Sequence, residues 1–164
     1  MAVFVALTVA VRFIPAPPQT HGLFHFLAFT IILSGLVLGW QAGFWVGAIS
    51  DVLCFMLFPT GPYFPGFTLT QALTGAIPAL LINGKEKNLV NLFWAISCGQ
   101  LSTKILLVPL FQYILFRPAD NLWSGWCLLA LPALGVQLIH IPIYAWSIHS
   151  ALKYLDTKKG TVLR

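Results

Sequence analysis

Three ionisable side chains, Arg12, Asp51 and Lys104, lie inside apolar segments of this sequence. A charged side chain within a membrane-spanning helix is costly, and it commonly marks a ligand pathway or an internal ion pair. A carboxylate such as Asp51 can accept paired N–H donors from a ligand ring, whereas the cations can hold an anionic group. Asp51 could equally neutralise Arg12. These charges are too sparse for the polar catalytic cluster of a membrane enzyme, and they favour a binding site.

The stretch "FPTGPYFPGFTLTQALTG" (58–75) interrupts two apolar segments with prolines, glycines and aromatic residues. Irregular backbone near a membrane is tolerated where protein or a watery cavity satisfies its polar groups. Tyr63, Phe64 and Phe67 could stack on a flat ligand, and Thr68 and Gln71 follow them into the next helix. The alternative is an interfacial aromatic belt beside threonines that bond to their own helix.

Other polar residues join this candidate set. His21 and His25 are spaced as a pair of metal ligands can be, but the sequence offers no third ligand, so we expect His21 to hydrogen-bond a ligand and predict no metal or cofactor. Thr103 lies beside the intramembrane lysine. Gln137 and His140, in the last apolar segment, could line the same cavity.

The composition of the chain indicates which kind of secondary structure positions these residues. Hydrophobic residues make up 59% and charged residues 8% of the 164 residues, and the mean hydropathy is +0.87. Soluble domains carry roughly 25% charged residues, so we predict an all-α integral membrane protein with one domain over 1–164. We expect a tight turn at "GWQAG" and a longer loop at "RPADNLWSG". The expected spans are residues 2–14, 23–38, 44–58, 68–82, 89–116 and 128–155.

The distribution of basic residues predicts the orientation. Lys85, Lys87, Lys153 and three further cations near the C-terminus would face the cytoplasm if the N-terminus does, and Arg117 would lie outside. This arrangement satisfies the positive-inside rule, so both termini are expected in the cytoplasm. The net charge of +5 therefore reflects membrane topology and does not indicate nucleic-acid binding.

The segment "GFWVGAISDVLCFMLFPTGPYFPGFTLTQALTGAI" resembles the third and fourth helices of S components of energy-coupling factor (ECF) vitamin transporters, with the folate-type branch nearest. The resemblance implies six transmembrane helices in a prokaryotic cytoplasmic membrane and a site for folate or a related pterin near the outer face. It also implies partners, namely a transmembrane coupling protein and two ATP-binding-cassette ATPases. The chain has no "GxxxxGK[ST]" motif, so ATP hydrolysis is expected in those partners.

The family docks on its coupling protein through a stripe of small residues on the first helix. Ala2, Ala6 and Ala10 have the matching spacing here, which lets helix backbones approach closely in lipid. The alternative is a packing face inside the bundle.

The chain also departs from the folate-type pattern. Arg12 matches a basic residue of the family's first helix, but Lys104 stands at a tryptophan position, and Leu134 or Gly135 stands where an arginine is common. Lys104 could bind the ligand's anionic group, it could snorkel towards the interface, or the ligand could be a different vitamin. A self-sufficient small transporter or channel is the rival from another class.

Overall fold

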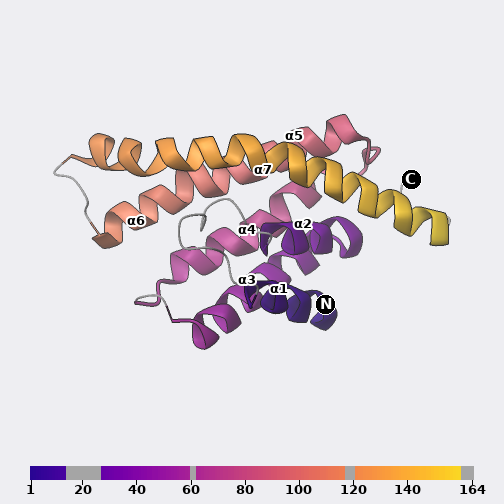
Figure 1. Cartoon of the computed structure of the whole chain (residues 1–164), viewed down its shortest axis with the longest axis horizontal. Coiled ribbons are helices and arrows are strands. Elements are labelled where there is room, and N and C mark those ends of the chain that lie inside the picture. The colour runs from indigo at the N-terminus through magenta and orange to yellow at the C-terminus, as the bar shows by residue number, and fades with distance from the viewer. Residues whose placement is uncertain (14–26, 60–61, 117–120, 160–164) are drawn as a thin grey trace.

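The computed structural model describes residues 1–13, 27–59, 62–116 and 121–159, and its regular structure in these residues is helical (Figure 1). This confirms the predicted all-α class. If α5, η2 and α6 are counted as one continuous helix, the described residues form six helices. The helices are α1 (Ala2–Arg12), α2 (Leu27–Leu38), α3 (Trp40–Leu57), α4 (Pro65–Ile82), α5 (Leu89–Gln100), η2 (Leu101–Leu107), α6 (Val108–Phe116) and α7 (Leu122–Lys159).

Helix length and composition agree with a membrane protein. Within the described residues, 4 apolar helices are long enough to span a bilayer, and α1 and α2 are shorter apolar helices. The 11 residues of α1 extend about 17 Å at 1.5 Å per residue, which is less than the hydrocarbon thickness of about 30 Å. The helix that carries Arg12 is therefore shorter than a full membrane span. The long spans are Trp40–Leu57, Pro65–Ile82, Leu89–Phe116 and Leu122–Leu155.

Successive helices, with α5, η2 and α6 counted as one, are antiparallel, so the bundle has two distinct ends (Figure 1). The start of α1, the start of α5 and the end of α7 lie at the end shown on the right. The connection between α3 and α4 and the end of α6 lie at the opposite end. Lys85, Lys87 and Lys153 thus belong to one end, as the predicted topology requires.

Three glycines bring α2, α3 and α4 into close contact. A Cβ at Gly35 or Gly43 would collide with the carbonyl oxygen of Gly75, and a Cβ at Gly75 would collide with the carbonyl oxygen of Gly43. Small residues allow this approach, and van der Waals packing holds helices together where lipid supplies no hydrophobic drive. The three helices consequently form a tight unit that fixes the position of Asp51 on α3.

The predicted start of the third helix was wrong. It was placed after the "GWQAG" turn, but α3 already begins at Trp40, and the reversal is made at Gly39, whose φ is 96°. Glycine accepts this backbone conformation without a steric penalty. Gly43, within the predicted turn, is instead a helical residue in the glycine contact.

Other predicted boundaries also need correction. The fourth helix starts at Pro65, three residues before its predicted start, because proline suits the first turn of a helix. The last helix starts at Leu122, so "NLWSG" is largely helical, and the amide N–H of Gly125 donates to the carbonyl of Asn121. The first helix ends at Arg12, followed by a turn at Phe13. The predicted starting region of the second helix lies outside the described residues.

The apolar core occupies the end of the bundle that carries the termini. Ile32 of α2, Leu92 and Ile96 of α5, and Ile148 and Leu152 of α7 are all fully buried there. Buried polar side chains are spread over α1, α2, α3, α4, α5, η2 and α7. The bundle is therefore packed with apolar side chains near the termini.

Candidate ligand-binding site

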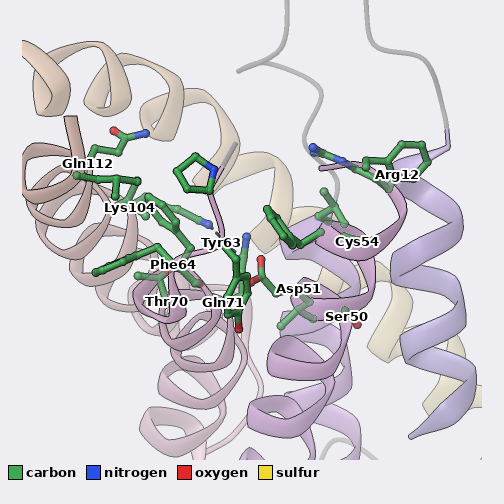
Figure 2. A pocket seen from close by; sticks show the side chains of 18 of the residues that line it. Arg12, Ser50, Asp51, Cys54, Tyr63, Phe64, Thr70, Gln71, Lys104 and Gln112 are labelled. Carbon is green, nitrogen blue, oxygen red and sulfur yellow. Dashed lines mark hydrogen bonds between the residues drawn. The ribbon is translucent and has the colours of Figure 1, made fainter. Parts of the chain in front are cut away.

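A cavity of about 490 Å³ opens between α1, α2, α3, α4, η2 and α6 at the end of the bundle that carries the α3–α4 connection. Its volume lies within the range of about 300–1,000 Å³ that small-molecule sites occupy. Aromatic side chains and a few polar or charged groups form its walls (Figure 2). The lining residues are Thr8, Arg12, Leu27, Ile31, Ser50, Asp51, Cys54, Phe55, Phe58, Pro62, Tyr63, Phe64, Phe67, Thr70, Gln71, Lys104, Val108, Gln112, Leu115 and Phe116.

Asp51 stands at the end of a chain of hydrogen bonds. The Thr68 hydroxyl donates to Oδ2 of Asp51 at 2.7 Å, and the Tyr63 hydroxyl lies 2.9 Å from the same Thr68 oxygen. Thr68 is in the first turn of α4, where it faces α3, and Tyr63 precedes that helix. The chain therefore connects the cavity to the α3–α4 connection.

Two cations enter the cavity from separate elements. Lys104 comes from η2, and its Nζ donates to Oε1 of Gln71 at 3.3 Å. Arg12 comes from the last turn of α1, on the opposite side of Asp51 in Figure 2. The carboxylate thus lies between two positively charged groups, and Gln112 adds a neutral polar side chain near Lys104.

The aromatic lining divides into two groups. Phe64 packs edge-on against Phe67 and Phe111, with ring centroids 5.7 and 5.4 Å away. Tyr63 instead packs against Phe55 at 5.1 Å, with the rings tilted by 55°. Tyr63, Phe64 and Phe67 all line the cavity as the stacking hypothesis requires, but they approach it from two different clusters.

The structure brings most of the predicted residues together and leaves some apart. Thr68 does not line the cavity itself, but its hydroxyl hydrogen-bonds the lining residue Asp51. Thr103 is fully buried, donating to the Gly99 carbonyl and contacting Thr74 at 3.2 Å. Gln137 and His140 are buried on α7 and are also absent from the lining residues, while His21 lies outside the described part of the chain.

Several lining residues were not predicted from the sequence, notably Ser50, Cys54, Phe55 and Gln112. Helical spacing from the charged residues could have found two of them. Cys54 and Phe55 lie three and four residues after Asp51, so each shares a helix face with that predicted residue. Among the described residues, no group of three or more histidines, cysteines or acidic residues could hold a metal ion.

The alanine stripe lies on the outside of the bundle. Ala2, Ala6 and Ala10 are exposed, whereas Thr8 on the same helix is fully buried and hydrogen-bonds Thr30 of α2 at 2.8 Å. The face of α1 that packs inside the protein is therefore the threonine face. The alanine face remains available to a partner.

Comparison with known proteins identifies the family. The family model for the S component of ECF-type riboflavin transporters matches residues 1–153. A curated relative, the folate transporter FolT of Clostridium novyi (strain NT), is 29% identical over 126 residues, which is 77% of this chain and 70% of that protein. A crystal structure of FolT bound with folic acid is similar, with a TM-score of 0.73 and 26% identity over 90% of this chain and 88% of that one. The chain therefore belongs to the S components of ECF-type transporters, which are the substrate-binding membrane subunits of those systems.

Proposed function

We propose that this S component binds folate or a related pterin in the cavity beside Asp51. The observation that carries the proposal is the arrangement of one carboxylate between two cations, Arg12 and Lys104, within aromatic walls. Folate combines a flat ring that bears N–H donors with a tail that bears carboxylates. Each part of such a ligand has a chemical complement in the cavity, and similarity to FolT supports the assignment.

The ring would be recognised through Asp51 and Gln71. Asp51 accepts hydrogen bonds when ionised, so it suits the neighbouring ring N–H and amino groups of a pterin. Lysine has no acceptor, so its bond to Oε1 leaves the Gln71 amide nitrogen as the donor for a ring carbonyl. Phe55, Phe64 and Phe67 would contact the ring faces and edges.

The acidic tail would be held by the cations. An arginine can form two parallel hydrogen bonds to a carboxylate, and a lysine acts as a point charge. Lys104 lies in the middle of the Leu89–Phe116 span and is partly buried beside Gln71, so it can reach an anion inside the cavity. In this proposal Lys104 supplies a positive charge in place of the arginine that folate-type relatives carry near position 134.

Delivery would follow by docking on an ECF coupling protein energised by two ATPases in a prokaryotic cytoplasmic membrane. The exposed stripe of Ala2, Ala6 and Ala10 supports this docking mode, since small residues permit close contact between helices in lipid. The lysines at the opposite end from the cavity support an orientation with cytoplasmic termini, which leaves the cavity facing outward.

Riboflavin is the second candidate, because the matching family model is described by that ligand. Its ring is flat and could occupy the aromatic cavity. However, riboflavin carries no carboxylate, so it would leave Arg12 and Lys104 without an anionic partner from the ligand. The charges of the cavity therefore favour the folate assignment.

Titration of the purified protein with three compounds tests the proposal. Calorimetry with folic acid, with a pterin that lacks the glutamate tail, and with riboflavin should give the tightest binding for folic acid and weaker binding for the tail-less pterin. If only riboflavin bound tightly, the ligand would be assigned as riboflavin and the folate assignment would be wrong. Mass spectrometry of the ligand that copurifies with the protein provides an independent check.

A further inference from the structure

We infer that Tyr63 and Thr68 are positioning residues that fix the orientation of the Asp51 carboxylate for its ligand. The inference rests on the proposed function, because it concerns how that site presents its acceptor. The observation is the chain of hydrogen bonds from the Tyr63 hydroxyl through the Thr68 hydroxyl to Asp51 Oδ2.

The direction of this chain follows from the number of protons available. A threonine hydroxyl has one hydrogen, and Thr68 gives it to Asp51 over 2.7 Å. The Tyr63 hydroxyl, 2.9 Å from Thr68, must therefore be the donor in the remaining bond. All donors point towards the carboxylate, which is the arrangement that stabilises an ionised acceptor.

Tyr63 is held at two points, and these points have different roles. Its ring packs against Phe55, which lies four residues after Asp51 on the same face of α3. Its hydroxyl bonds Thr68 at the start of α4. Removing only the hydroxyl would leave the ring contact in place, so the positioning role can be separated from the aromatic role.

The consequence for recognition concerns the second carboxylate oxygen. Because Oδ2 is occupied by Thr68, the carboxylate cannot rotate freely, and Oδ1 is left to accept from a ligand. A fixed acceptor selects ligands whose N–H donors meet it in one geometry, since preorganised groups lose less entropy on binding. Loss of the chain should therefore weaken ligands that donate to Asp51.

The experiment uses Tyr63→Phe, Thr68→Val and the double variant of the purified chain, with Tyr113→Phe as the control. Tyr113, on α6, is outside the cavity lining and loses the same hydroxyl group. Calorimetry with folic acid should show about a threefold to tenfold loss of affinity for Tyr63→Phe and a larger loss for Thr68→Val, as expected for one hydrogen bond and for two. Tyr113→Phe should retain full affinity.

The double variant tests the chain directly. Tyr63 reaches Asp51 only through Thr68, so adding Tyr63→Phe to Thr68→Val should cost no further affinity. Losses that multiply would mean that the two residues act independently, and the inference would be wrong.

A ligand-free measurement separates this inference from the proposed function. Hydrogen–deuterium exchange over residues 62–68 should accelerate in both single variants and stay unchanged in Tyr113→Phe. If exchange accelerates but no pterin binds the unmodified protein, the chain of bonds holds and the ligand assignment fails. Unchanged exchange in both Tyr63→Phe and Thr68→Val would overturn the inference whatever the ligand proves to be.

Discussion

At the scale of single residues, the proposed function assigns one set of cavity residues to the ring of the ligand and another set to its anionic tail. Asp51, Gln71 and the phenylalanines offer an acceptor, a donor and aromatic contacts, whereas Arg12 and Lys104 offer positive charge. Substitutions in the two sets should therefore affect different parts of the ligand. The following two predictions use this difference.

Phe64→Ala should weaken folic acid and the tail-less pterin alike, by roughly 1–3 kcal/mol, through lost aromatic contact. The ring of Phe64 also supports Phe67 and Phe111, so its removal loosens that whole wall. Calorimetry with both compounds measures the effect. Phe93→Ala, on α5 and outside the cavity lining, is the control and should leave both affinities unchanged. A loss confined to folic acid would place Phe64 against the tail.

Lys104→Met should weaken folic acid by about 2 kcal/mol or more and the tail-less pterin much less, because a charge-assisted bond to a carboxylate is lost. Methionine keeps most of the side-chain length, so the change is mainly one of charge. Lys85→Met, which removes an exposed lysine at the other end of the bundle, is the matched control. Equal losses for both ligands would mean that Lys104 acts only by orienting Gln71.

The sequence predicted the charged and aromatic members of the site better than its neutral members. Arg12, Asp51 and Lys104 stood out because a charge in an apolar segment is rare. Ser50 and Cys54 carry no such signal, since small polar residues also occur in ordinary helix packing. Gln137 and His140 looked similar in sequence but lie on α7, and only the packing of the helices shows which faces meet the cavity.

At the scale of elements, the glycine contact between α2, α3 and α4 leaves no room for a larger side chain. Gly75→Ala should destabilise the fold by about 1–3 kcal/mol, because a Cβ would meet the Gly43 carbonyl and lie 2.8 Å from Cγ2 of Ile31. Thermal unfolding in detergent measures the loss. Gly135→Ala on α7 is the control, since a Cβ there meets nothing within 4 Å, and it should be neutral or stabilising. Equal stability of both variants would contradict the close packing.

The π-helical segment η2 could not be read from hydrophobic periodicity, although the span that contains it was predicted correctly as residues 89–116. Pro109 lacks an N–H and crowds the preceding turn, which disturbs the regular pattern of helix hydrogen bonds just after η2. Such segments are frequent at functional sites. Here the segment carries Lys104, whose Nζ donates to Oε1 of Gln71.

At the scale of the whole molecule, the two ends of the bundle differ in packing and in charge. The apolar core and Lys85, Lys87 and Lys153 lie at the end of the termini, and the cavity, with Lys104, lies at the other end. In a variant without Cys54, Cys98 and Cys127, a cysteine at Pro59 should react with an impermeant thiol reagent added outside cells, and one at Glu86 should not. Retained folic-acid binding shows that the variant is folded. The reverse labelling would place the cavity in the cytoplasm.

The exposed alanine face of α1 is the proposed docking surface for the coupling protein. Ala6→Trp should abolish uptake in cells that express the coupling protein and ATPases, because an indole ring would hold the docking helices apart. The purified variant should still bind folic acid with nearly unchanged affinity, since Ala6 is exposed and the cavity is reached from the opposite face of α1, at Thr8. Val90→Trp, at an exposed position on α5 away from α1, is the control and should preserve uptake. If Ala6→Trp lost binding and uptake together, the alanine face would be supporting the fold of the S component itself and could not be assigned to docking.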